Sequence, residues 1–90
     1  MNKTSFGTIT KVNIPIHGQC DFLTFFEKGR EHHHNSKESF FVTNGEGLVF
    51  IDGNEFVIKK GDSMTISENS KHFMKPNDGE ILELILWYHD

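Results

Sequence analysis

Short runs of apolar and β-branched residues recur along the chain at intervals of about ten residues, with Gly, Asn and Asp between them. Short strands at this spacing are typical of an all-β sandwich or barrel. No stretch of ten or more residues combines a 3.6-residue apolar period with helix caps. The pattern therefore predicts an all-β fold with strands at residues 7–14, 21–27, 38–43, 48–51, 55–58, 63–66, 71–75 and 80–88.

Two connections between these runs have specific turn chemistry. Asp52 and Gly53 lie between two strand-forming runs, and both tolerate the positive φ that a type I′ hairpin turn requires. Residues 44–47 contain two glycines, which allow a close approach or an unusual φ in a second tight connection. The sequence thus predicts a hairpin around residues 52–53 and a tight turn at 44–47.

The last predicted strand is apolar on both faces. Alternation along a strand places Leu82, Leu84 and Leu86 on one face and Ile85 and Trp87 on the other. Such a strand either lies between two layers of one domain, or packs one face into its own barrel and the other against a second subunit. Because a short chain holds a small core, we favour the second interpretation and expect a homodimer.

The length and composition indicate one domain. Ninety residues provide a single hydrophobic core, so we interpret residues 1–90 as one domain. Phe is abundant, with nine residues against one Trp and one Tyr. A Phe side chain fills a core without requiring a hydrogen-bond partner, so we expect these rings to pack in the interior.

The charge balance and the distribution of apolar residues argue against several partners. The formal net charge is −4, and no basic patch that could bind phosphates is visible, so nucleic acid is not expected as a partner. No apolar run approaches the roughly 18–20 residues that span a membrane, and residues 1–10 lack the apolar core of a signal peptide. Cys20 is the single cysteine, which excludes an internal disulfide. We therefore expect a cytoplasmic protein.

Four residues have the donor chemistry of a transition-metal site: His32, His34, Glu38 and His72. On a strand, His32 and His34 point to the same side and His33 to the other. Glu38 shares the parity of the pair, and His72 would arrive from a distant strand. Three imidazoles and one carboxylate suit a borderline divalent metal and leave positions open to water, substrate or dioxygen.

Two other interpretations of these residues remain open. The three consecutive histidines could belong to a solvated loop, although their internal position and the matched residues downstream argue against this. Alternatively, the four side chains could converge and yet hold no metal, because the affinity of a site cannot be derived from its spacing.

The spacing of the first three ligands resembles the first motif of the cupin superfamily, G-x5-H-x-H-x3,4-E-x6-G. His32, His34, Glu38 and Gly45 match this motif at full spacing. The opening glycine does not match, because Gly29 lies only two residues before the pair.

A second cupin motif, G-x5-P-x-G-x2-H-x3-N, resembles the segment that contains the fourth ligand. Gly61 and His72 match, whereas Ser67, Asn69 and Pro76 replace a proline, a glycine and an asparagine. Asn69 tolerates the left-handed conformation that glycine would adopt there. All four ligand positions are therefore retained.

The resemblance implies a jelly-roll, antiparallel β-barrel of six to eight strands (a double-stranded β-helix) with the metal in its mouth. Cupins commonly bind iron, manganese, nickel or zinc, and many form dimers by exchanging edge strands. Some act as dioxygenases, decarboxylases or isomerases, and others only bind ligands.

Three hypotheses for function follow. The first is a metal-dependent enzyme, of dioxygenase or isomerase type, that acts on a small molecule. The second is a module that binds or senses a small ligand without turnover. The third rests on a looser resemblance of residues 50–87 to the cupin domain of sugar-phosphate isomerases.

The parity of the strand residues also predicts the interior wall beside the metal. Phe40 and Val42 share the parity of Glu38, so we expect them to face inward. On an earlier strand either Phe22, Thr24 and Phe26 or the alternate residues, Leu23 and Phe25, face the same way.

Overall fold

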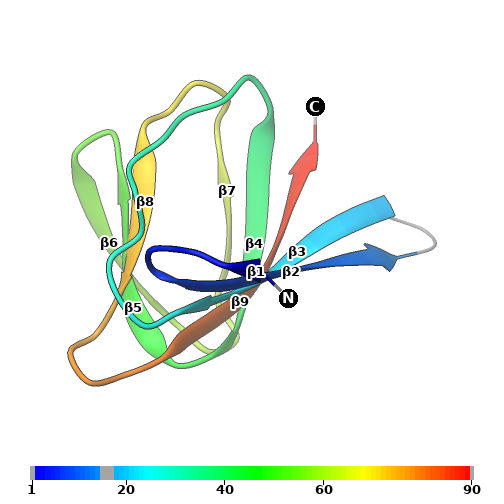
Figure 1. The fold of residues 1–90 in the computed structure, drawn as a ribbon. Coiled ribbons are helices and arrows are strands. Elements are labelled where there is room, and N and C mark those ends of the chain that lie inside the picture. The colour runs from blue at the N-terminus through cyan, green and yellow to red at the C-terminus, as the bar shows by residue number, and fades with distance from the viewer. Residues whose placement is uncertain (1, 15–17, 90) are drawn as a thin grey trace.

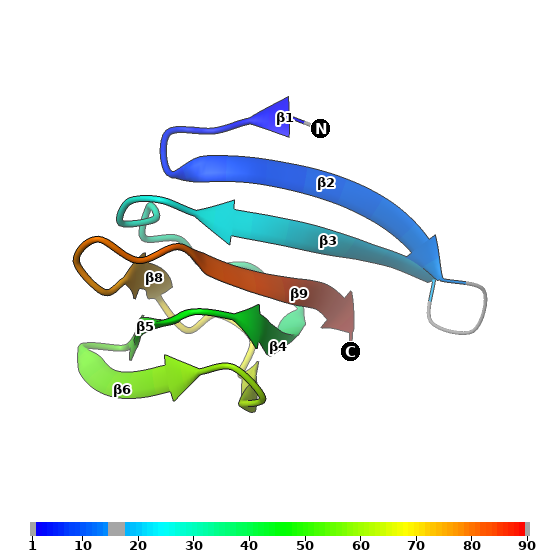
Figure 2. The same ribbon diagram turned by 90° about the horizontal axis from the view of Figure 1, so that it is seen from below.

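The computed structural model describes residues 2–14 and 18–89, which form nine strands in two antiparallel sheets (Figure 1). The larger sheet has the strand order β1-β2-β3-β9-β4-β7, and the smaller has the order β6-β5-β8. Figure 2 shows β1, β2, β3 and β9 side by side in this order. The strands are β1 (Asn2–Lys3), β2 (Gly7–Ile14), β3 (Gly18–Phe25), β4 (Lys37–Asn44), β5 (Glu46–Ile51), β6 (Asn54–Lys59), β7 (Ser63–Ile66), β8 (His72–Pro76) and β9 (Leu82–His89).

The all-β prediction is confirmed, and each of the eight predicted strands is present. Strands β2 and β7 have the predicted bounds, and the other six differ at their ends by one to three residues. Strand β1 was not predicted, because two residues are too few to show an alternating pattern. The segment 82–89 is a strand that pairs with both β3 and β4 and so lies between them in the larger sheet.

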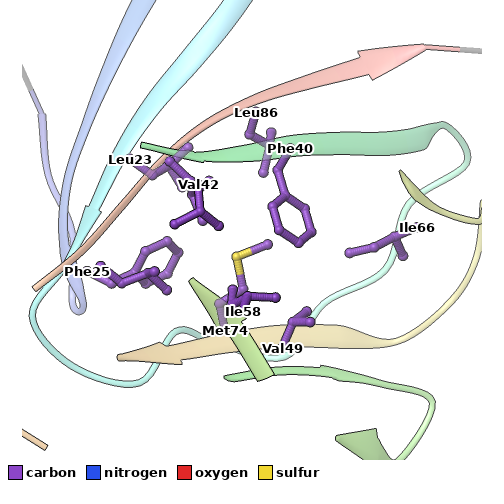
Figure 3. Close-up of a cluster of buried hydrophobic side chains, with 11 residues drawn as sticks. Leu23, Phe25, Phe40, Val42, Val49, Ile58, Ile66, Met74 and Leu86 are labelled. Carbon is purple, nitrogen blue, oxygen red and sulfur yellow. The ribbon is translucent and has the colours of Figure 1, made fainter. Parts of the chain in front are cut away.

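The core lies between the two sheets, in the arrangement of a jelly-roll barrel. In Figure 3, Phe40, Val42 and Leu86 from the larger sheet point toward Val49 and Met74 from the smaller one. Burying these apolar side chains between the sheets supplies the main stabilisation of the fold.

The parity predictions for the interior wall hold, and the structure selects between the two sets left open on β3. Phe40 and Val42 are fully buried on the inner face of β4. On β3, Leu23 and Phe25 are the buried pair, whereas Phe26 follows the strand and is exposed.

The expectation that the Phe rings pack inside is wrong for three of them. Besides Phe26, Phe41 and Phe56 have large exposed fractions. Phe41 follows the inward-facing Phe40 on the same strand, so alternation directs it to the outer face of the larger sheet. Phe56 lies on β6, which forms an edge of the smaller sheet and therefore has a neighbouring strand on one side only.

Both predicted turns have the expected backbone conformation. Asp52 and Gly53 have φ values of 49° and 84°, as a type I′ turn requires. Gly45 has a φ of 84°, and a Cβ atom there would clash with the carbonyl oxygen of Ile81. Asn69 has a φ of 63° and occupies the left-handed conformation that its cupin counterpart reaches with glycine.

In the part of the chain that the structure describes, no helix has the length and apolar character needed to cross a membrane. The cytoplasmic location stays a prediction.

Candidate metal centre

Backbone pairing brings the first and last of the four candidate ligands together. Residues 29–34 form an irregular segment, not a full strand, that runs beside β8. The amide of His32 donates to the carbonyl of His72 (3.0 Å), and the amide of His72 donates to the carbonyl of His32 (2.9 Å). The amides of Gly29 and Asn69 continue the pairing, because they donate to the carbonyls of Met74 and His34. A segment that is distant in sequence from β8 is thus held in register with it.

The three candidate imidazoles converge on one carboxylate oxygen of the fourth candidate, Glu38. Glu38 extends from the inner face of β4, and its Oε1 lies 3.0 Å from Nε2 of His34 and 3.1 Å from Nε2 of His72. Nε2 of His32 is 3.9 Å from the same oxygen. One ligand atom from each of the four residues lies within 4.8 Å of the others. His33 is exposed and takes no part in this cluster, as its opposite parity predicted.

The other nitrogen of each ring is bound to the backbone. Nδ1 of His32 lies 3.0 Å from the carbonyl oxygen of Arg30, and Nδ1 of His34 lies 3.0 Å from that of Ser36. In the third ring, Nδ1 of His72 is 2.8 Å from the carbonyl oxygen of residue 70. A carbonyl oxygen only accepts, so each Nδ1 carries the hydrogen and donates it. In a neutral ring, Nε2 then presents a lone pair.

Three lone pairs that face one carboxylate oxygen repel it unless a cation lies between them. That cation is either a proton on a ring nitrogen or a metal ion. The hydrogen-bonding carboxylate of Glu38 raises the pKa of His32, although partial burial lowers it. Burial also raises the pKa of Glu38, but the hydrogen bonds and charge of the histidines outweigh burial and bring this pKa down to about 2. Glu38 is therefore a carboxylate at neutral pH.

The donor set fits a divalent transition metal. Two donors that each lie about 2.1 Å from one ion are about 3 Å apart when the angle between them is near 90°, close to the spacing of Glu38 Oε1 from His34 and His72. Histidine ligands characteristically donate their second N–H to a carbonyl or carboxylate, and all three rings here do so. Moreover, Oε2 of Glu38 is buried with no hydrogen-bond partner among residues 2–14 and 18–89. This oxygen is therefore available as a second metal-binding atom of the same carboxylate.

The cluster is closed on one side and open on the other. The side chains of Glu38 and His72 are each 1% exposed, whereas those of His34 and His32 are 25% and 50% exposed. A cavity of about 400 Å³ begins at this open side and extends between the sheets. Its lining consists of Phe6, Ile9, Asp21, Leu23, Phe25, Gly29, Arg30, Glu31, His32, Glu38, His72, Phe73, Met74, Leu86 and Tyr88.

Tyr88 is a neighbour of the cluster that sequence reasoning did not identify. It lies opposite Glu38 in the register of β4 and β9, and its ring packs edge-on against His34 with 4.7 Å between centroids. Tyr88 is 49% exposed, and its partial burial, followed by the charges of Glu38 and Asp21, raises its pKa to about 12. The phenol is therefore neutral and can act as a hydrogen-bond donor. The pairing of β9 with β4, which brings Tyr88 beside the cluster, is not visible in the sequence.

The fold and the site together define a small antiparallel jelly-roll barrel with a three-histidine, one-glutamate cluster between its sheets. A sequence model of the cupin domain matches residues 25–88, and the chain belongs to this family. The resemblance found in the two motifs is thereby confirmed.

Comparisons with individual proteins agree with this assignment. The chain is 30% identical over 63 residues to an acireductone dioxygenase of Bacillus thuringiensis, covering 64% of this chain and 36% of that protein. It is similar to the plu4264 protein of Photorhabdus luminescens (25% identity, TM-score 0.73, 80% of this chain and 62% of that one). A cupin 2 conserved barrel domain protein of Salinispora arenicola superimposes with a TM-score of 0.77 at 18% identity, covering 91% and 74%. The chain spans about a third of the length of the curated relatives it matches.

Proposed function

We propose that this cupin holds one divalent transition metal through His32, His34, Glu38 and His72, and that it acts on a small molecule in the adjoining cavity. The observation that carries the proposal is the arrangement of the rings. Three Nε2 atoms surround one buried carboxylate oxygen, and all three Nδ1 atoms are tied to the backbone. Iron, manganese, nickel and zinc are all compatible with three nitrogen donors and one oxygen donor.

A bound ion would supply a Lewis-acid centre with positions open to an oxygen donor of the ligand or to dioxygen. The residues of the chain have separate roles around it. Glu38 provides a permanently ionised donor, since its pKa is about 2. The backbone carbonyls hold the imidazoles in one tautomer. Tyr88, a neutral phenol beside His34, can donate a hydrogen bond to a polar group of the ligand.

Two activities are compatible with this site. The partial match to an acireductone dioxygenase supports a metal-dependent dioxygenase. The alternative is a module that binds or senses the same small molecule without turnover. Oxygen consumption by the iron-loaded protein in the presence of candidate substrates separates the two: uptake supports the enzyme, whereas ligand binding without uptake supports the module.

The metal content of the purified protein tests the proposal. We expect one ion per chain by elemental analysis after dialysis against metal-free buffer. His34→Ala should lose most of this metal while its far-UV circular dichroism stays that of a β-protein, because the barrel rests on its apolar strands. His33→Ala is the matched control, since this neighbouring side chain is exposed and outside the cluster. Full metal content in His34→Ala would refute the role of His34.

We further propose that two copies of the chain pair through the outer face of the larger sheet. Phe22, Ile85 and Phe41 are successive register partners on β3, β9 and β4, and they form an apolar row across that face. The adjacent row on one side contains Trp87 and Ser39 and carries no charge, whereas the row on the other side contains Glu83. Interface centres are depleted in charged residues and enriched in aromatic ones. In a two-fold symmetric dimer, this row on one subunit can pack against the same row on the other.

A further inference from the structure

Besides the candidate metal ligands, the polar side chains that line the cavity are Asp21, Arg30, Glu31 and Tyr88, and the remaining lining residues are apolar. Its far wall is built from Leu23, Phe25, Met74 and Leu86, which belong to both sheets and are buried. Phe6 closes this end, because its ring stacks on that of Phe25 with 4.5 Å between centroids. A ligand that enters past His32 therefore meets donors at one end and apolar side chains at the other.

Gly29 packs against the apolar end of the cavity. Gly29 is buried, and its amide donates to the carbonyl of Met74. A Cβ atom at residue 29 would lie 3.0 Å from the ring of Phe25 and 3.2 Å from the Met74 carbonyl oxygen. The backbone of residue 29 thus packs directly on the Phe25 ring, which holds that ring as part of the wall.

Apart from the candidate metal centre, the charges around the cavity do not suit a phosphorylated ligand. Arg30 is the one Lys or Arg that the described part of the chain contributes to the lining, and it is exposed. Asp21 and Glu31 also line the cavity and are acidic, and Lys11 pairs with Asp21 at 3.3 Å. Phosphate groups are recognised by several convergent donors, with Arg and Lys foremost. Burying a dianion against these apolar walls would carry a large desolvation cost.

From this juxtaposition we infer that the cavity takes an unphosphorylated molecule with one metal-binding polar head and an apolar body that packs on Phe6 and Phe25. The inference deepens the proposed function and rests on it. It also separates this chain from sugar-phosphate isomerases, the third hypothesis from the sequence. A cavity of about 150 Å³ is enough for one benzene ring, so about 400 Å³ accommodates a head group and a body of at least one ring.

Three probes that share one head group and differ in the rest of the molecule test the inference. Acetohydroxamate, benzohydroxamate and phosphoglycolohydroxamate are titrated calorimetrically into the zinc-loaded protein, whose zinc content is measured on the same sample. We expect benzohydroxamate to bind about tenfold more tightly than acetohydroxamate, and phosphoglycolohydroxamate no more tightly than acetohydroxamate. Equal affinity for the first two probes, or tightest binding of the phosphorylated one, overturns the inference.

Two matched variants locate the effect. Phe6→Ala shortens the apolar end and should reduce the preference for benzohydroxamate at least about threefold. Phe56→Ala makes the same chemical change at an exposed position on β6, outside the cavity, and should leave the preference unchanged. If Phe56→Ala lowers the preference as much as Phe6→Ala does, the probe does not occupy the cavity.

A second readout does not require the metal and so separates failure of the inference from failure of the proposed function. In ¹H–¹⁵N spectra of the metal-free protein, benzyl alcohol should shift the amide signals of Phe6, Leu23 and Phe25. Glycerol 3-phosphate should leave them in place. If only glycerol 3-phosphate shifts these signals, the inference is overturned even when the protein binds zinc. If only benzyl alcohol shifts them, the inference is supported even when the protein fails to bind zinc.

Discussion

His32 and His72 face each other across two reciprocal backbone hydrogen bonds of 3.0 Å and 2.9 Å. The spacing of these two imidazoles is therefore set by main-chain pairing, and their ring centroids lie 4.3 Å apart. Glu38 reaches the same point from the opposite sheet, where its neighbours Ile66 and Tyr88 fix its strand in register. The candidate site is thus held by both sheets, and a metal ion would join the two layers of the barrel.

We predict that the affinity for zinc rises with pH between about 6 and 8. A metal ion binds the neutral form of imidazole, so protons compete with it at the histidines. Glu38 raises the pKa of His32 above the usual 6.5, which moves this competition to higher pH. Glu38 itself, with a pKa of about 2, stays ionised and does not contribute. Competition with a chromophoric chelator at several pH values measures the effect, and a flat profile would contradict it.

In the metal-free protein, the stability of the fold should fall as the pH rises through the pKa of His32, opposite to the trend in zinc affinity. The raised pKa of His32 means that its ion pair stabilises the fold fully below pH 6.5 and loses this effect as the pH rises through the folded-state value. The depressed pKa of Glu38 means that the interactions of its carboxylate with the histidines stabilise the fold above pH 4.5. This contribution is lost as the pH falls toward about 2. Urea unfolding midpoints should therefore decline on both sides of an optimum between about pH 5 and 6.5. Greater stability of the metal-free protein at pH 9 than at pH 6 would contradict this assignment.

Much of this site follows from local sequence. The spacing of His32, His34 and Glu38 matches the first cupin motif and so predicted that they share a site. Alternation alone did not establish it, because residues 29–34 form an irregular segment and a bend precedes β4. The inward set on β4 was also predictable, since Phe40 and Val42 share the parity of Glu38. On β3, by contrast, both alternating sets contain Phe residues, so hydrophobicity alone could not choose the inner face.

The remaining features depend on strand order, which local patterns do not encode. The placement of β9 between β3 and β4 brings Tyr88 opposite Glu38, across 50 positions of sequence. Likewise, the pairing of His32 with His72 joins an irregular segment to a strand that begins 40 residues later. These contacts arise from how the two sheets close on a shared core, and they become visible only in the folded chain.

Tyr88 provides a test of how tightly His34 is held. Tyr88→Phe keeps the ring that packs against His34, so the affinity for zinc should stay within about threefold of the wild type. Tyr88→Ala removes that support and should lower the affinity about tenfold, in the range seen when groups that orient a metal ligand are lost. Chelator competition measures both variants. Equal losses in the two would instead assign the effect to the phenol oxygen.

Two glycines with the same backbone conformation separate strain from steric clash. Gly45 and Gly53 both have a φ of 84°, but a Cβ atom at residue 53 would meet nothing within 4 Å. Gly53→Ala should therefore cost about 1–2 kcal/mol, the strain of a left-handed alanine. Gly45→Ala should cost about 1–3 kcal/mol more, because its Cβ also clashes with the Ile81 carbonyl. Urea unfolding gives both values, and equal costs would show that the backbone near Ile81 yields without penalty.

The proposed dimer predicts that one charge on the outer face of the larger sheet separates the subunits. Wild-type protein should elute at twice the chain mass of 10.4 kDa, and Phe41→Asp should elute as a monomer with its β-sheet circular dichroism retained. The side chain of Phe41 points away from the core, so a carboxylate there is solvated in the monomer but buried at the interface. Val57→Asp is the matched control, because Val57 is also exposed but lies on the smaller sheet. A monomeric wild type at micromolar concentration would refute the dimer, and dissociation by Val57→Asp alone would place the interface on the smaller sheet.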